Sequence, residues 1–307
     1  MTPGATGTVF LLTDYGLEDE FAGLTRAVVL RLAPGAPVVD LTHGVPPFDV
    51  RAGALALSRS VVHLGPGVVV AVVDPGVGSG RRAVAVDVNT PAGPAGPVGP
   101  AGPAGPRYLV GPDNGLLPWA LDALGGATAA VVLPHAAGAQ AGAPGGAVAP
   151  GGAGAQVGAP EGSGGTFDGR DLFAPVAARL WLGASLHDVG IPVDPESLVR
   201  LPAPVVEVGA GSIETEVLWV DRFGNAQLAA RADHWTEAGL GDGVEIRTGG
   251  VVRTGRRVAS FSALRGDEVG LLVDANGQLS LVCDRRPAAT VLAVRAGDRV
   301  RLGSAPS

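Results

Sequence analysis

The chain has 307 residues, enough for two ordinary domains, and a hydrophobic fraction of 46% allows a true core although aromatic residues make up only 4%. Its formal net charge of -7 argues against a nucleic-acid-binding protein, because phosphate binding needs a basic surface. All 22 basic residues are arginine, so a lysine Schiff base and a Walker A phosphate loop are excluded.

The start of the chain, MTPGATGTVFLLTDYG, has neither the basic segment nor the apolar run of a signal peptide. No apolar run reaches the roughly 18 residues of a membrane span, so we expect a cytoplasmic protein without a membrane partner. The 5 histidines lack the spacing of a metal site, and no metal is expected.

Apolar runs alternate with helical periodicity along the first two thirds of the chain. This alternation predicts an α/β N-terminal domain with a mostly parallel sheet and flanking helices. The expected strands are 9–14, 37–44, 67–78 and one that begins near 107, and the expected helices are 19–32, 50–64 and one within 166–183. Ligands of such sheets bind beyond the carboxyl ends of strands, where Asp14 and Asp74 lie.

The domain organisation follows from shifts in composition. Residues 91–106 carry glycine at every third position, and 136–165 are almost uncharged Ala, Gly and Pro, so both are expected to be low-complexity insertions. From about residue 205, short strands alternate with turns, which predicts a smaller all-β barrel of about five to seven strands. The predicted domains are therefore 1–200 and 205–307.

The segment VVDPGVGSGRR places a carboxylate at a strand end, then a glycine-rich turn, then two arginines. Such a turn exposes backbone N–H groups and brings Asp74 close to Arg81, which suits a polar nucleophile. The alternative is a purely structural salt bridge. The turn is not a dinucleotide-binding fingerprint, because its glycines have the wrong spacing.

The segment WVDRFGNAQ (219–227) carries an acid, an aromatic ring and an amide at alternating positions. As a strand it would present Asp221, Phe223 and Asn225 on one face, toward a ligand with an amine and a ring. The alternative is a turn in which the Asp and Asn side chains bind the backbone.

Six segments occur in the order found in a known family. They are LTDYG (12–16), VVDLTHGVPPFDV (38–50), VVDPGVGSGRR (72–82), GPDNGLL (111–117), TFDGRDLFAP (166–175) and DRFGN (221–225). With them the chain resembles the S-adenosyl-L-methionine (SAM) hydroxide adenosyltransferases, which are related to the fluorinase and chlorinase. The resemblance covers both expected domains and omits only the two low-complexity segments.

The resemblance implies a homotrimer whose active sites lie between the N-terminal domain of one subunit and the C-terminal domain of its neighbour. It implies that SAM is the substrate and that no metal or other cofactor is used. Asp14 matches the residue that binds the ribose diol, Phe48 matches one that packs on the nucleoside, and Asp221 matches the acid that holds the methionine ammonium. The residues matched to the adenine pocket are Phe223, Asn225 and Phe261.

The same resemblance implies hydrolysis of SAM to adenosine and L-methionine by water or hydroxide attacking ribose C5′. The family activates water with an Asp, an Arg and a His, and Asp74 and Arg81 match the first two. This chain departs from the family with Asp168 in place of the histidine, and with Ala275 where relatives carry a serine near the methionine carboxylate.

Two other functions compete with hydrolysis. One is a SAM- or adenosine-binding protein with little turnover because of Asp168. The other is a SAM-dependent halogenase, which is disfavoured because a carboxylate beside the nucleophile repels halide.

Overall fold

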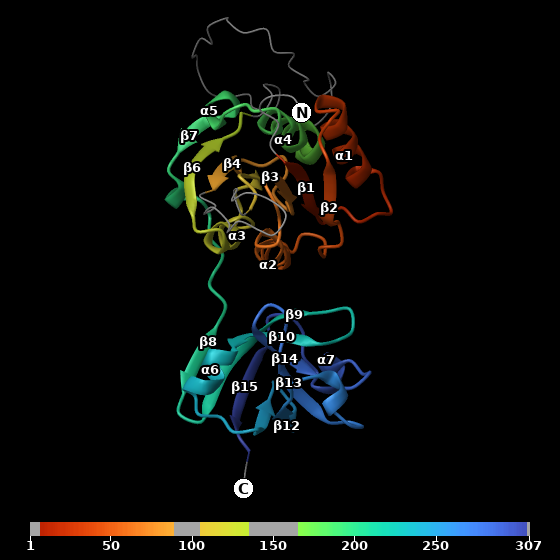
Figure 1. Ribbon diagram of the computed structural model, residues 1–307, viewed down its shortest axis with the longest axis vertical. Coiled ribbons are helices and arrows are strands. Elements are labelled where there is room, and N and C mark those ends of the chain that lie inside the picture. The colour runs from red at the N-terminus through yellow and green to blue at the C-terminus, as the bar shows by residue number, and fades with distance from the viewer. Residues whose placement is uncertain (1–6, 89–104, 135–164, 306–307) are drawn as a thin grey trace, which may run out of the picture. The chain divides into compact units, whose positions relative to one another are not determined.

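The computed structural model describes residues 7–88, 105–134 and 165–305 (Figure 1). The chain divides into two compact units, Met1–Leu201 and Pro202–Ser307. The expected insertions at 91–106 and 136–165 lie outside the described residues, apart from positions 105, 106 and 165.

The first unit alternates strands and helices. Its strands are β1 (Thr8–Thr13), β2 (Val38–Thr42), β3 (Gly67–Val72), β4 (Ala83–Val88), β5 (Tyr108–Pro112), β6 (Ala127–Val132) and β7 (Ile191–Val193). Its α-helices are α1 (Phe21–Leu32), α2 (Val50–Val61), α3 (Pro118–Ala123), α4 (Ala174–Trp181) and α5 (Leu186–Val189), with a π-helix η1 (Gly169–Phe173) and a 3-10 turn η2 (Pro195–Ser197).

These strands form one sheet in the order β2-β1-β3-β5-β4-β6-β7. The neighbours from β2 to β5 run parallel, whereas β4, β6 and β7 each pair antiparallel with their neighbours. The expected α/β unit is confirmed, and the antiparallel half adds strands that the periodicity did not predict. The parallel half places the carboxyl ends of β1 and β3 side by side, since β1 pairs with β3 in register.

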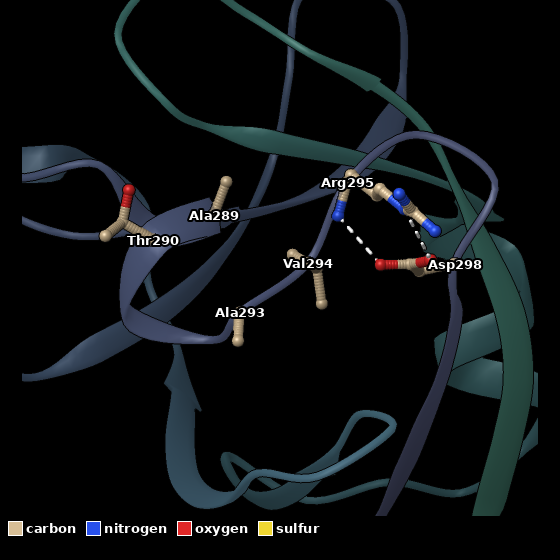
Figure 2. Close-up of a pocket in the computed structure, with 6 residues that line it drawn as sticks. All are labelled: Ala289, Thr290, Ala293, Val294, Arg295 and Asp298. Carbon is tan, nitrogen blue, oxygen red and sulfur yellow. Dashed lines mark hydrogen bonds and ion pairs between the residues drawn. The ribbon is translucent and has the colours of Figure 1, made fainter.

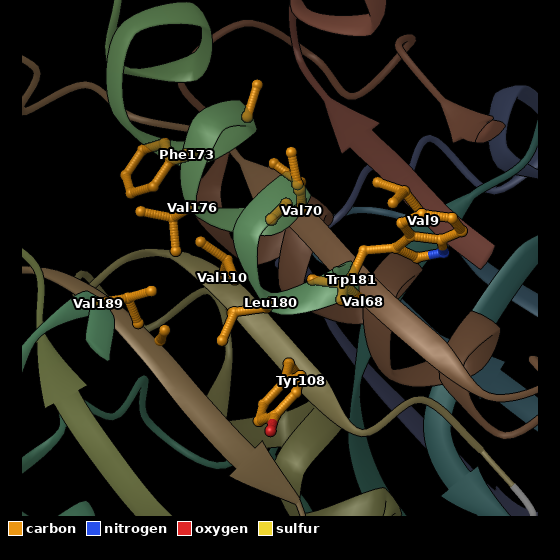
Figure 3. Close-up of a cluster of buried hydrophobic side chains, with 14 of the residues drawn as sticks. Val9, Val68, Val70, Tyr108, Val110, Phe173, Val176, Leu180, Trp181 and Val189 are labelled. Atoms are coloured by element: carbon orange, nitrogen blue, oxygen red, sulfur yellow. The ribbon is translucent and has the colours of Figure 1, made fainter. Parts of the chain in front are cut away.

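Helices cover both faces of this sheet, with α1 and α4 on one side and α2 and α3 on the other (Figure 1). Figure 3 shows the core under α4, where strand valines meet the aromatic and aliphatic side chains of that helix. Phe173 and Leu180 are fully buried there, in the same hydrophobic cluster as Val68 and Val70. Burial of such side chains is the main stabilising contribution to the fold, at about 1.5–3 kcal/mol each.

Gly111, the first residue of the GPDNGLL segment, lies in β5 against β3. A Cβ atom at this position would stand 2.3 Å from the carbonyl oxygen of Ala71. Only glycine therefore lets the two strands approach each other here.

The second unit is all β apart from two short helices and a 3-10 turn. Its strands are β8 (Val206–Gly209), β9 (Ser212–Val220), β10 (Ala226–Arg231), β11 (Gly243–Arg247), β12 (Val252–Arg257), β13 (Val269–Val273), β14 (Gln278–Val282) and β15 (Arg299–Ser304). The helices are α6 (Ala232–Glu237) and α7 (Ala288–Val291), and the 3-10 turn is η3 (Phe261–Ala263).

Seven of these strands close into a barrel, in the order β10-β14-β13-β12-β11-β15-β9, because β9 also pairs with β10. The eighth strand, β8, extends the sheet outside the ring by pairing with β9. The predicted barrel is thus confirmed. Among the residues described, no helix is both long and apolar enough to cross a lipid bilayer.

Candidate active site

An ion cluster lies beyond the carboxyl end of β3. Arg81 donates from Nε to both oxygens of Asp74, at 3.0 and 2.9 Å, and its Nη2 also bonds to that carboxylate. The turn between the two residues is held by the Asp74 side chain, which accepts the backbone N–H of Gly76 at 3.2 Å. The glycine-rich turn therefore does bring the carboxylate and the guanidinium together.

Asp168 completes this cluster from a distant part of the sequence. Its Oδ2 accepts a hydrogen bond from Arg81 Nη2 at 2.5 Å. Asp168 immediately precedes the π-helix η1, and short π-helical turns are frequent at functional sites. The side chains of Asp74, Asp168 and Arg81 are only 5%, 8% and 10% exposed, so the cluster is a largely desolvated group of charges.

The electrostatics of the cluster keep Arg81 charged. Burial alone would lower the Arg81 pKa, but hydrogen bonds and charge attraction from Asp74 and Asp168 outweigh it, so the pKa is raised. The Arg81 guanidinium also lies 5.4 Å from the centre of the Phe173 ring. Its Nη1 is buried and has no hydrogen-bond partner within the ranges that the structure describes. That atom is a donor available to a small ligand such as water.

Asp14 lies at the neighbouring strand end, after β1, and holds the loop that carries Phe48. Its Oδ2 accepts the backbone N–H of Phe48 at 2.9 Å. Phe48 has φ 66°, in the left-handed region that non-glycine residues rarely adopt, and its side chain is 70% exposed. The hydrogen bond thus stabilises a strained conformation that presents an aromatic ring to the surroundings.

Tyr15, which the sequence analysis did not single out, lies beside the ion cluster. Its pKa is raised by burial first, and then by the negative charges of Asp14, Asp74 and Asp168. The sequence offered one signal, since Tyr15 directly follows Asp14 in the LTDYG segment. Its proximity to Asp168 depends on the fold.

In the second unit, residues 221–225 form a turn between β9 and β10, so the interpretation of a continuous strand was wrong. The turn alternative is correct for Asp221, whose side chain binds the backbone, but the Asn225 side chain binds the Asp221 carboxylate instead. Asp221 Oδ1 accepts the backbone N–H groups of Phe223 and Asn225, at 2.8 and 2.9 Å. Its Oδ2 accepts Asn225 Nδ2 at 2.7 Å. A carboxylate can accept about four hydrogen bonds, which leaves capacity for a ligand donor.

The same turn requires Gly224 and presents an aromatic side chain. Gly224 has φ 82°, and a Cβ there would stand 2.2 Å from that of Pro287. The neighbouring Phe223 is 73% exposed. Phe261, in η3 of the same unit, is 46% exposed.

Ala275 lies in the turn between β13 and β14, which is organised by its neighbour Asp274. The Asp274 carboxylate accepts four hydrogen bonds, from the backbone of Asn276 and Gln278 and from the side chains of Gln227 and Ser280. The turn is therefore stabilised without a hydroxyl at position 275.

Figure 2 shows a surface pocket that none of the sequence-predicted site residues lines. It belongs to the second unit and is lined by Ala289, Thr290, Ala293, Val294, Arg295 and Asp298. Its charged pair is joined by a hydrogen bond from the Arg295 backbone to Asp298 at 2.9 Å. The Arg295 side chain is 89% exposed, so this solvated pair lacks the desolvated charges of the ion cluster.

Comparison with known proteins identifies the family. Residues 9–94 and 103–190 match the SAM hydroxide adenosyltransferase N-terminal domain, and residues 215–301 match the C-terminal domain. The chain belongs to the SAM hydroxide adenosyltransferase family. In this family context, the ion cluster is built from two of the six characteristic segments, VVDPGVGSGRR and TFDGRDLFAP.

Known proteins resemble this chain to different degrees. A Salinispora tropica protein named (R)-S-adenosyl-L-methionine hydrolase is 42% identical over 297 residues, covering 97% of this chain and 98% of that protein. A fluorinase of an Actinoplanes species is 24% identical over 249 residues, covering 78% of this chain and 76% of that protein. The crystal structure of an uncharacterized conserved protein from Thermotoga maritima has a TM-score of 0.78 at 27% identity, covering 96% of this chain and 100% of that one.

Removing the shared cation should destabilise the first unit. We expect Arg81→Met to lower the free energy of unfolding by about 3–5 kcal/mol near neutral pH, because two desolvated carboxylates lose the charge between them. In the variant, the Asp74 and Asp168 carboxylates repel each other, and protonation of one of them relieves this repulsion. The Tm of Arg81→Met should therefore fall less far below that of the unmodified protein at about pH 5 than at about pH 8.

The effect is measured as the Tm of the unmodified protein and of Arg81→Met, by thermal unfolding across this pH range. Arg285→Met is the matched control, since the Arg285 side chain is 92% exposed and its loss should change stability by about 0.5 kcal/mol or less. An Arg81→Met protein as stable as the control variant at every pH would contradict the prediction.

Proposed function

We propose that the chain hydrolyses SAM to adenosine and L-methionine through attack of water on ribose C5′. The observation that carries this proposal is the desolvated cluster of Asp74, Arg81 and Asp168 beyond the end of β3. The 42% identity to a protein named (R)-S-adenosyl-L-methionine hydrolase, over nearly the whole of both chains, supports the same reaction. By that likeness, the proposed substrate is the R epimer at sulfur.

The reaction is an in-line displacement. The water oxygen forms a bond to C5′ while the C5′–S bond breaks, and the bonding electron pair moves to sulfur and neutralises the sulfonium. The leaving thioether needs no proton, so no general acid is required. The water loses one proton, which passes through a carboxylate of the cluster to solvent, and Arg81 stabilises the hydroxide character that develops. Asp74 holds Arg81 in place with its bidentate hydrogen bonds.

The charge of the cluster fits this substrate. Two carboxylates and one guanidinium sum to a formal charge of one negative unit, and the side chains are largely buried, where charge interactions are strong. Such a site attracts a sulfonium cation and repels halide. Hydrolysis is therefore favoured over halogenation.

The remaining residues bind the substrate in this proposal. Asp14 takes the ribose hydroxyls, beside the backbone N–H of Phe48 that it already accepts. Phe48 packs on the nucleoside, and Asp221 takes the methionine ammonium with its remaining acceptor capacity. The adenine is taken by Phe223, Asn225 and Phe261. No cofactor has a role, because the sulfonium itself supplies the electrophilic pull.

The products and the source of oxygen test the reaction. We expect adenosine and methionine in equal amounts when the protein is incubated with SAM. In water labelled with heavy oxygen, the label should appear in the adenosine 5′-hydroxyl, because water is the nucleophile. Mass spectrometry of the products decides. Unlabelled adenosine, or a halogenated nucleoside in concentrated halide, would contradict the proposal.

Asp168 sets the expected rate. A carboxylate paired with Arg81 shares a proton with water less readily than an imidazole does near neutral pH. Asp168→His should therefore raise kcat by roughly ten-fold and leave KM within a few-fold, as expected for an interaction made in the transition state.

Steady-state kinetics of Asp168→His and of Asp168→Asn, which has neither charge nor imidazole, separate the possible roles. If the histidine variant is slower than the unmodified protein, and the asparagine variant slower still, Asp168 is itself a competent base. Unchanged kcat in both variants would remove position 168 from the mechanism.

We also propose a homotrimer in which residues of two subunits form each site. The aromatic side chains matched to the substrate pocket are all exposed. They are Phe48 in the first unit, and Phe223 and Phe261 in the second. Aromatic residues are enriched at protein interfaces and in ligand pockets, which supports a role in binding. We expect light scattering to give a molecular mass three times that of the chain. On dilution, the activity should fall in proportion to the fraction of trimer. A fully active monomer would contradict this assembly.

A further inference from the structure

The loop that carries Tyr15 is fixed by buried hydrogen bonds at the end of β1. The Tyr15 backbone N–H donates to Thr13 Oγ1 at 3.1 Å, and that hydroxyl is bonded to His43 Nδ1 at 2.8 Å. The next residue, Gly16, donates its N–H to the His43 carbonyl at 2.8 Å. Thr13 and His43 are both buried, so this backbone position has little freedom.

The Tyr15 ring is fixed as well. It lies 6.0 Å from the ring of Phe21 and 5.6 Å from that of Phe167, centre to centre, and those two rings are 5.1 Å apart. The three rings come from three separate segments and meet in tilted and edge-on geometries, which aromatic pairs prefer. The direction in which the phenol points is therefore set by packing.

The hydroxyl of Tyr15 points to the backbone next to Asp168. A Cβ atom built on Gly169 would stand 2.1 Å from the Tyr15 hydroxyl oxygen. The phenol thus occupies the space that a side chain at position 169 would otherwise fill. Since Asp168 precedes this glycine and is bonded to Arg81, the hydroxyl lies beside the ion cluster.

The charges around the phenol keep its proton in place. Burial, and then the carboxylates of Asp14, Asp74 and Asp168, raise the pKa of Tyr15, against a smaller opposing effect of Arg81. The group is consequently a neutral hydroxyl, able to donate one hydrogen bond and to accept others. It cannot act as a base near neutral pH, so any role in the reaction is that of a hydrogen-bonding group.

We propose that the Tyr15 hydroxyl contacts the attacking water and, together with Arg81 Nη1, orients it toward C5′. This inference rests on the proposed SAM hydrolysis. The cluster already engages Arg81 Nε and Nη2, which leaves Nη1 as its buried donor without a partner in the described part of the chain. Tyr15 keeps its proton throughout, while the water proton leaves through a carboxylate.

The chain provides a matched control because it has only two tyrosines. Tyr108, in β5, is 2% exposed and its phenol pKa is also raised by burial, but it belongs to the sheet core. We expect Tyr15→Phe to lower kcat by roughly a hundred-fold, the lower end of the loss for one donor at a reacting oxygen, with KM within about two-fold. Tyr108→Phe should leave both constants within about two-fold of the unmodified values.

A second variant tests whether the hydroxyl acts from its place against Gly169. Gly169→Ala should displace the phenol oxygen and lower kcat, since the added methyl group overlaps it. The double variant Tyr15→Phe, Gly169→Ala should be no slower than Tyr15→Phe alone, because both changes act through the same hydroxyl. Its methyl group would meet the ring carbons at about 3.0 Å, a contact that a small shift relieves.

The readouts are initial rates of adenosine release, with thermal unfolding to establish that each variant is folded. A kcat for Tyr15→Phe within two-fold of the unmodified value, or an alkaline limb of the pH–rate profile that vanishes in this variant, would overturn the inference. Fully additive losses in the double variant would also overturn it. If the unmodified protein releases adenosine and Tyr15→Phe releases it equally fast, only this inference is contradicted. If the unmodified protein releases no adenosine, the proposed function is contradicted as well.

Discussion

One buried cation organises the chemistry of the first unit. Arg81 joins the Asp74 carboxylate at the end of a central strand to the carboxylate of Asp168, which lies 87 residues from Arg81 in sequence and precedes a π-helix. Desolvating these three groups is costly unless each is paired, so their geometry is tightly constrained. In the turn before Arg81, Gly78 has φ 76°, a conformation that glycine adopts without strain, and the glycine after Asp168 leaves space for the Tyr15 phenol.

The two units present exposed aromatic rings by the same physical device. In the first, the Asp14 carboxylate accepts the backbone N–H of Phe48, and in the second, the Asp221 carboxylate accepts that of Phe223. Each acid therefore fixes the loop of an aromatic residue before any substrate arrives. Such preorganisation reduces the entropy lost on binding, because backbone positions that are already fixed need not be ordered by the ligand.

The sequence predicted most of the fold and part of the site. Apolar runs located β1 and β3 with the acids that follow them, and the change in periodicity near residue 205 located the barrel. The strand β4 was missed because its short alternating run, AVAVDV, lies between the arginines and a low-complexity segment. The turn at 221–225 was ambiguous, since alternating polar residues fit a strand face as well as a turn. Tyr15 was missed because the space that Gly169 leaves for it exists only in three dimensions.

The π-helix η1 constrains the number of residues between Asp168 and Phe173. Between Asp168, which faces Arg81, and Phe173, which is fully buried in the core, the backbone turns with the wider spacing of η1. Removing one residue would convert this turn to an ordinary α-helix and rotate everything before it by about 100° relative to α4. Asp168 would then turn away from Arg81 while the core stayed in register. The length of this segment is thus constrained at both ends, by the ion pair of Asp168 with Arg81 on one side and by the burial of Phe173 on the other.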